Sequence, residues 1–342
     1  MNGAVSVRTL LVSGIAIAAL AAAHPTGQQG RGARGGAEAS YIWPTPTDAD
    51  LRLVRDALDI HTHLDPDSAG AHSSQQPRSI DVIDAAKRAK ALGMRGFVIK
   101  QHYDQSAQLA YVVRKEVPGV EVFGLVGQNL AIGGVNPAAV HHMAEVKGGW
   151  GRIVMMPTWD GENNVKRGAD QTRPFVSVVR NGQVTAEVKE VISIVAGTKT
   201  RDSSGDLVLA TGHSSADEAL MILREGQRQG VRHMVVTHAI GNPVFMTLAQ
   251  MQEAVTLGAF LEFVAQYTMG PKPAFAPAAY ADAIRKVGID HVVMSTDFGQ
   301  QGRPIPPDGL ALFAGLMKKE GFTDQELRRM MAENPARLLG LH

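Results

Sequence analysis

The sequence contains no cysteine in its 342 residues. Disulfides are therefore excluded, and a metal site in this chain has to be built from His, Asp, Glu or Lys. The chain also lacks an excess of either charge, with 34 basic and 33 acidic residues. A nucleic-acid or anionic-membrane surface needs a concentrated basic face, so the charge balance argues against both kinds of partner.

The N-terminal apolar run, residues 10–23, falls short of the roughly 20 residues that span a membrane. One Arg precedes this run, and Ala21 and Ala23 fit an A-x-A cleavage site. We interpret residues 1–23 as the signal peptide of an exported protein, periplasmic or secreted, rather than as an uncleaved anchor. Stable membrane insertion is then not expected after cleavage. The Gly-rich residues 24–45 are predicted to form a flexible leader.

The rest of the chain has ample apolar material for a core, with 44% hydrophobic and 20% charged residues. At roughly 150 residues per domain the length suggests two domains, but α/β barrels run longer as one. Short apolar runs alternate with segments of helical period, which favours parallel strands joined by helices. The eight predicted strands are 57–63, 96–102, 120–126, 152–158, 207–213, 233–239, 259–265 and 291–297. Eight such units predict a (β/α)8 barrel of the TIM type over residues 46–342, as one domain.

Helix ends are marked by capping residues. We expect one helix to begin at Ser79 and close at Gly93, and another to begin at Ser214 or Ser215. Thr323 and Glu326 form the pattern of a capping box. An Asn-Gly pair within residues 173–197 predicts a small hairpin insertion before the helix that precedes strand five.

The segment DALDIHTHLDP, residues 56–66, places Asp59, His61 and His63 at alternating positions of strand one. Alternation predicts that all three side chains share one strand face, with Asp59 deepest and orienting a ligand imidazole. Glu262, in the middle of AFLEFVA, is costly if buried without a partner, so we expect it to be functional or paired with Arg or Lys.

Polar residues close most of the predicted strands, at the barrel end where chemistry occurs. Imidazole and carboxylate ligands suit Zn²⁺ and similar divalent ions, and a catalytic ion brings the pKa of its water toward about 7. Asp297 is then well placed as the base that moves protons. The strand-closing polar residues are His61, His63, Lys100, His102, Thr158, His213, His238 and Asp297.

The motifs DIHTH, TGH, VTH, STD and NPARLLGL, in this order, resemble the amidohydrolase superfamily of metal-dependent hydrolases. VIKQH, GGVNPAAV, MMPT, ATGHSS and STDFGQ together look like a poorly characterised amidohydrolase-like subgroup. The resemblance covers roughly residues 55–342. It implies that four histidines bind metal or activate water and that Asp297 is both ligand and proton shuttle. The four are His61, His63, His213 and His238, of which His238 is also a candidate catalytic residue.

The chain departs from the superfamily pattern after strand four. Binuclear members bridge two ions there with a carboxylated lysine or a glutamate, whereas this chain reads MMPTWDGEN. Lys100 on strand two is the nearest substitute, because a lysine that adds CO₂ becomes an anionic ligand. We therefore expect one or two divalent ions, with Zn²⁺ as the leading candidate.

The resemblance implies a small-molecule substrate. His102, Trp159 and Asp160 are the candidate substrate-binding residues, because His102 closes strand two at the mouth and the other two follow strand four. The leading hypothesis is a hydrolase in which metal-bound hydroxide attacks an amide, lactone or other ester bond. A metal-dependent lyase or decarboxylase on the same barrel is the first alternative. A non-catalytic metal- or ligand-binding barrel is the second, since the strand-four ligand is missing.

Overall fold

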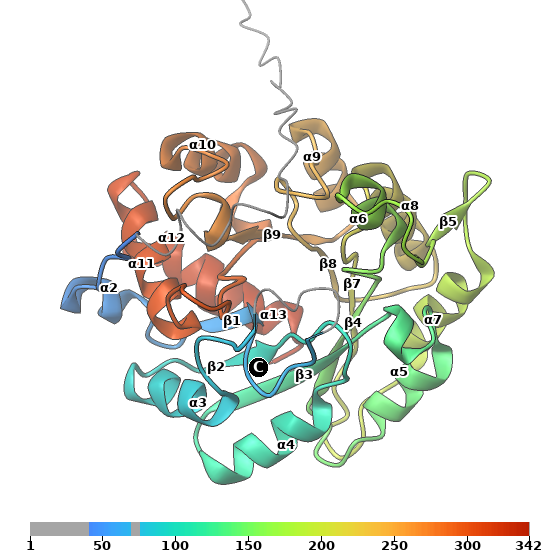
Figure 1. Cartoon of the computed structure of the whole chain (residues 1–342), viewed down its shortest axis with the longest axis horizontal. Helices are drawn as coiled ribbons and strands as arrows, with labels where there is room; N and C mark the ends of the chain where they lie inside the picture. The colour runs from blue at the N-terminus through green and yellow to red at the C-terminus, as the bar shows by residue number, and fades with distance from the viewer. Residues whose placement is uncertain (1–40, 70–75, 342) are drawn as a thin grey trace, which may run out of the picture.

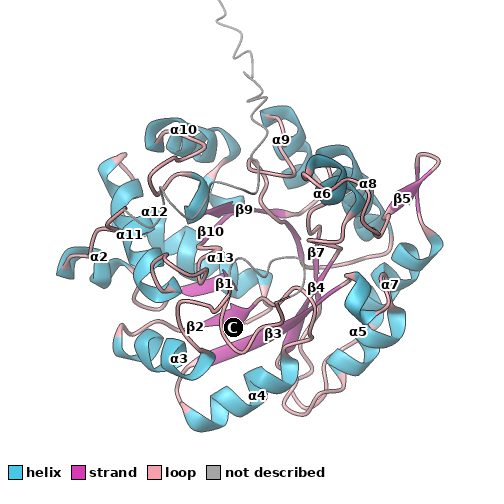
Figure 2. Ribbon diagram, in the orientation of Figure 1, coloured by secondary structure: helices cyan, strands magenta, loops and turns pink. Residues whose placement is uncertain are grey.

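The computed structural model describes residues 41–69 and 76–341. The predicted signal peptide and most of the leader lie outside these residues. Eight parallel strands pair in chain order, and Figure 2 shows them as a ring surrounded by helices. Their bounds are β1 (Leu58–Thr62), β2 (Gly96–Ile99), β3 (Glu121–Gly127), β4 (Gly151–Met155), β7 (Val208–Ala210), β8 (Met234–Val236), β9 (Phe260–Val264) and β10 (Val292–Ser295).

The ring closes between its first and last strands, just past the end of β10. The backbone N–H of His63 donates to the Phe298 carbonyl (2.8 Å), and the N–H of Asp297 donates to the His61 carbonyl (2.9 Å). The predicted TIM-type barrel is therefore confirmed, and its closure lies among the candidate site residues.

Helices surround the ring, and α13 (Asn334–Leu338) lies across its middle in the view of Figure 1. They are α2 (Asp48–Leu53), α3 (Val82–Ala91), α4 (Ala107–Glu116), α5 (Pro137–Ala144), α6 (Glu162–Arg167), α7 (Ala186–Gly197), α8 (Ala216–Arg228), α9 (Leu248–Thr256), α10 (Pro277–Val287), α11 (Pro306–Lys319), α12 (Asp324–Arg328) and α13 (Asn334–Leu338). Within the described ranges, no helix combines the length and apolarity needed to cross a membrane.

Two apolar clusters stabilise the barrel. The larger one fills the layer between strands and outer helices. The smaller one draws on alternating strand positions and fills the barrel interior, where Leu338 and Leu339 at the end of α13 join it. Its strand residues are Leu58, Ile60, Val98, Phe123, Leu125, Ile153, Met155, Val208, Ala210, Val235, Phe260 and Val293. The interior is thus a packed core, which leaves the carboxyl ends of the strands as the place for a site.

The hairpin and most helix ends agree with the sequence-based predictions. Strands β5 (Val179–Arg180) and β6 (Gln183–Val184) form the antiparallel hairpin before α7. Ser215 caps α8, and the Thr323–Glu326 capping box is present. The prediction of Ser79 as the cap of α3 was wrong. Asp81 caps this helix by accepting from two backbone N–H groups, while the N–H of Ser79 donates to the Gly299 carbonyl in the loop.

The strands are shorter at their carboxyl ends than predicted. β7 ends at Ala210 and β8 at Val236, so His213 and His238 lie in the turns that follow. The turn before His213 requires glycine, because Gly212 has φ of +60° and an added Cβ would overlap the Met156 carbonyl. Turn geometry, rather than strand alternation, therefore aims these two imidazoles.

Candidate metal centre

The polar face predicted for β1 is divided by a bulge. The pairing of β1 with β2 shifts register between Asp59 and Thr62, and Ile60 packs in the barrel interior next to the inward-facing His61. A bulge places an extra residue on one strand and breaks the period of two. Asp59 therefore leaves the face occupied by His61, contrary to the prediction.

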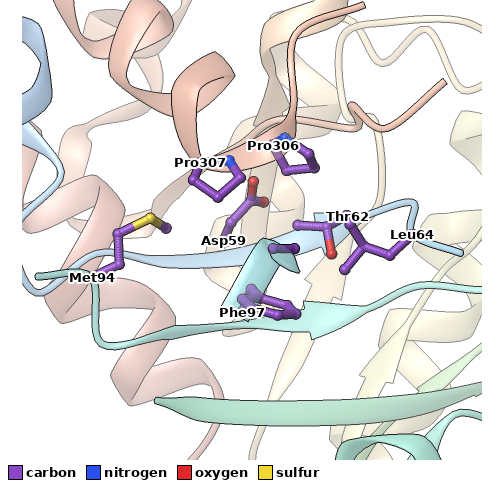
Figure 3. Close-up of a pocket in the computed structure, with 8 residues that line it drawn as sticks. Asp59, Thr62, Leu64, Met94, Phe97, Pro306 and Pro307 are labelled. Carbon is purple, nitrogen blue, oxygen red and sulfur yellow. The ribbon is translucent and has the colours of Figure 1, made fainter. Parts of the chain in front are cut away.

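Asp59 points outward, into a small void beneath α3 and α11. Figure 3 shows its carboxyl group near Pro306 and Pro307, with Phe97 and Met94 on the strand side. The carboxyl accepts hydrogen bonds from Thr296 Oγ1 (2.6 Å) and from the backbone N–H of His61 (3.1 Å). Burial raises the pKa of Asp59 to about 7, although these hydrogen bonds act to lower it. Asp59 thus holds the backbone of the bulge and not the imidazole that it was expected to orient.

The imidazole of His61 is oriented by Glu262 instead. His61 Nδ1 lies 3.0 Å from Glu262 Oε1, and because a carboxylate accepts, this nitrogen carries the proton. Its Nε2 lies 3.2 Å from Asp297 Oδ1. Glu262 is therefore partnered, as its burial requires, but by a histidine rather than by the Arg or Lys that the sequence suggested.

His213 and His238 follow the same pattern. His213 Nδ1 lies 3.3 Å from Asn164 Oδ1, whose amide is fixed because its Nδ2 donates to the Trp159 carbonyl (2.9 Å). His238 Nδ1 contacts the hydroxyl of Tyr267, and that hydroxyl donates its own proton to the Asn242 carbonyl. Both Nδ1 atoms therefore donate, which leaves each Nε2 with its lone pair.

Three buried Nε2 atoms lack a hydrogen-bond partner among the described residues: those of His61, His213 and His238. The ring of His238 lies 5.1 Å from the ring of His61 and 5.1 Å from that of His213, centroid to centroid. Histidines held through one nitrogen, with the other directed into a shared space, are the arrangement that metal ligands adopt. The residues present therefore fit a divalent ion.

Asp297 lies among these imidazoles. Its Oδ1 lies 2.9 Å from His63 Nε2, and its Oδ2 accepts from the Gln266 side-chain amide and lies 3.5 Å from His238 Nε2. His61, His63 and Asp297 form one buried group with ligand atoms mutually within 4.8 Å, and His61, His238 and Glu262 form another. The first group is the better ion site. Glu262 already accepts from His61, from Ser295 Oγ (2.8 Å) and from the His238 backbone N–H (3.2 Å).

The charges in this cluster depend on one another. Burial opposes ionisation of His61, but the carboxylates of Glu262 and Asp297 outweigh it and raise its pKa to about 9. Burial lowers the pKa of His238 to about 4 and holds the pKa values of His63 and His213 well below the usual range. Burial acts to raise the pKa of Asp297, yet His61 and His238 keep it well below its usual range. The metal-free site therefore carries a proton on His61 that an ion has to displace.

The backbone at two candidate catalytic residues is strained. His238 has φ of +55° and Asp297 has φ of +53°, in the left-handed region. Such a conformation costs of order 1–3 kcal/mol in a non-glycine residue and persists only where the surroundings impose it. Strain of this kind is common at functional sites, and the roles of both residues stay predictions.

Lys100 and His102 lie beside the cluster, and His102 differs from the other histidines. Trp159 Nε1 donates to its Nε2 (2.6 Å), and its Nδ1 lies 2.9 Å from Thr158 Oγ1. Both ring nitrogens are engaged, and the ring stacks on His63 with centroids 5.0 Å apart. The Lys100 amine lies 3.2 Å from His102 Nδ1, and burial lowers its pKa to about 8. Lys100 as a metal ligand stays a prediction.

Asp160 serves its own loop in this structure. Its Oδ1 pairs with Arg173 (2.8 Å) and its Oδ2 accepts from the Leu130 backbone N–H (3.0 Å). Trp159, one residue earlier, closes the space over His102, so of the two it is the residue that faces the cluster. The predicted substrate contacts of both residues remain predictions.

Sequence reasoning missed several residues that hold the cluster. Asn164, Tyr267 and Gln266 each bond a candidate ligand, yet they come from a helix after β4 and a turn after β9. No spacing rule connects them to the histidines they touch. Glu262 was the exception, because a glutamate within an apolar strand signals a required partner.

The chain belongs to a family of unknown function, DUF6282, whose model matches residues 56–262. The matched part contains the four candidate histidines and Glu262 but ends before Asp297. No curated protein matches the chain.

Solved structures share the fold at low sequence identity. The lactonase from Listeria monocytogenes is 16% identical, with a TM-score of 0.52 over 85% of this chain and 96% of that chain. The organophosphorus hydrolase from Deinococcus radiodurans is 14% identical, with a TM-score of 0.52 over 88% of this chain and 100% of that chain. An amidohydrolase from Pseudomonas aeruginosa is 13% identical, with a TM-score of 0.53 over 85% and 97%. These likenesses confirm the barrel that the superfamily resemblance implied.

Proposed function

We propose that this protein is an exported, metal-dependent hydrolase that cleaves an amide, lactone or other ester bond of a small molecule. The observation that carries the proposal is the set of three imidazoles held at Nδ1, each with a buried Nε2 that has no hydrogen-bond partner among the described residues. The names of the structural neighbours, lactonase and organophosphorus hydrolase among them, support the same class.

His61, His63, His213, His238 and Asp297 are the residues that we propose to hold the ion. Zn²⁺ suits this donor set, and the number of ions is one or two. When bound, the ion would supply Lewis acidity toward a carbonyl or phosphoryl oxygen and would lower the pKa of a water. Export rests on the predicted signal peptide.

Asp297 is the proposed proton carrier. Its carboxylate is anionic at neutral pH, because His61 and His238 keep its pKa well below the usual range. As an anion it has an oxygen that can accept the proton of an attacking water and pass it to the leaving group. His238 is fixed by Tyr267 with the lone pair of Nε2 toward Asp297, so it is placed to bind the ion or to accept a proton from water.

The test is a substrate panel of lactones, N-acyl amino acids, dipeptides and phosphate esters, assayed with wild-type protein and the Asp297→Asn variant. We expect hydrolysis of at least one class by the metal-loaded wild type and a loss of about 10²–10⁴-fold in kcat for the variant. Hydrolysis that is undiminished in the variant would remove Asp297 from its role. A metal-loaded protein that hydrolyses no class but releases CO₂ from a carboxylic acid would favour the lyase alternative.

A further inference from the structure

The turn that follows β9 touches two candidate catalytic residues. This 3-10 turn, Ala265–Tyr267, directs Gln266 to the Asp297 carboxylate and Tyr267 to the His238 ring. Neither Gln266 nor Tyr267 is among the proposed metal ligands. Tyr267 fixes the tautomer of His238, and Gln266 contacts the carboxylate of Asp297.

The orientation of the Gln266 amide is determined by Arg303. The guanidinium of Arg303 donates from Nη1 to Gln266 Oε1 (3.0 Å), and a guanidinium has no acceptor. The oxygen of the amide must therefore face Arg303, and the Nε2 group faces Asp297. Gln266 accordingly donates to Asp297 Oδ2 and has no alternative flipped state while Arg303 is in place.

The two oxygens of Asp297 are consequently held from different sides. His61 and His63 lie against Oδ1, and Gln266 donates to Oδ2. The terminal torsion of a carboxylate is broad, so hydrogen bonds to both oxygens define its orientation more closely than a contact with one. His238 Nε2 also lies 3.5 Å from Oδ2, but this nitrogen carries a lone pair and does not donate, so Gln266 supplies the hydrogen bond to Oδ2.

We infer that Gln266, oriented by Arg303, is a positioning residue that fixes the Asp297 carboxylate for metal binding. The inference rests on the proposed function, because it assumes that Asp297 is a ligand. Removing an outer partner of a metal ligand lowers metal affinity by about 10–100-fold. The competing explanation is that Gln266 and Arg303 only tie the loop after β9 to the loop after β10.

The experiment titrates the metal-free protein with Co²⁺ and records the visible absorption spectrum of the bound ion together with the dissociation constant. Three variants are compared with wild type: Gln266→Met, Arg303→Met and Gln300→Met. Gln300 is the matched control, because its buried amide donates to the backbone carbonyl of Asp297 (2.8 Å) and not to the carboxylate.

For Gln266→Met we expect an altered Co²⁺ spectrum and a dissociation constant raised by about tenfold or more, with the thermal midpoint unchanged. Arg303→Met, which frees the amide to flip, should weaken Co²⁺ binding in the same direction by a smaller factor. Arg303→Met also serves as the test variant if Gln266→Met does not fold. Gln300→Met should leave the spectrum as in wild type.

An unchanged Co²⁺ spectrum and affinity in both Gln266→Met and Arg303→Met would overturn the inference while leaving the proposed function intact. Equal weakening in Gln300→Met would also overturn it, because general loosening of the loop would then explain the effect. If wild-type protein binds no Co²⁺ at all, the proposed function itself fails, and the inference fails with it.

Discussion

Glu262→Gln is the substitution that most directly probes how the site is held. Glu262 is 2% exposed and accepts three hydrogen bonds, from His61 Nδ1, Ser295 Oγ and the His238 backbone N–H. Its charge helps to raise the pKa of His61 to about 9 against burial, so the carboxylate makes this imidazole a stronger base and a stronger ligand. The amide that replaces it keeps the shape but removes the charge.

We expect Glu262→Gln to weaken Zn²⁺ binding by about 10–100-fold, which corresponds to roughly 1.4–2.7 kcal/mol. The assay is competition for Zn²⁺ against a chromophoric chelator at fixed pH. Glu121→Gln is the matched control, because Glu121 begins β3 at the opposite end of the barrel and pairs with Arg95. Equal affinities for wild type and Glu262→Gln, or an equal loss in Glu121→Gln, would refute the reasoning.

Three further predictions concern pH, backbone and substrate. In the metal-free protein the pKa of His61 is raised from 6.5 to about 9, so the stability it contributes is complete below pH 6.5 and is lost as pH rises. The free energy of unfolding, measured with urea, should fall by up to about 1.4 kcal/mol per pH unit between pH 6.5 and 8. An equally steep slope in Glu262→Gln would show that Glu262 does not raise the pKa of His61. Gly299→Ala should destabilise the protein and reduce metal binding, because Gly299 has φ of +120° and an added Cβ would overlap the His63 carbonyl. A thermal midpoint and a Zn²⁺ affinity equal to those of wild type would contradict this prediction. Trp159→Phe removes the donor to His102 and should raise KM more than it lowers kcat for any substrate found, whereas a purely kcat effect would argue against substrate contact.

The arrangement of strands was predictable because parallel strands and amphipathic helices each leave a periodic signal. The hairpin was predictable for a local reason: Asn181 and Gly182 have φ of +51° and +71°, which this residue pair tolerates. The histidines that close the strands were also visible, since the barrel topology brings the carboxyl ends of all eight strands to one face.

The bulge in β1 could not be read from the sequence. Strict alternation placed Asp59 with His61, but the extra residue turns Ile60 and His61 inward together and leaves Asp59 outside the barrel. The partners of the imidazoles were equally hidden, because Asn164 and Tyr267 lie 49 and 29 residues from the histidines they hold. Contacts between loops depend on loop conformation, and loops leave no periodic pattern in the sequence from which their conformation could be predicted.

The proposed function depends on the binding of a divalent ion by His61, His63, His213, His238 and Asp297. Its most direct test is the metal content of protein purified without chelator, before and after incubation with Zn²⁺, by mass spectrometry of the elements. We predict about one or more equivalents of metal per chain, lost in a His61→Ala, Asp297→Ala double variant that remains folded. Less than about half an equivalent, not increased by added Zn²⁺, Mn²⁺ or Co²⁺, would contradict the proposal.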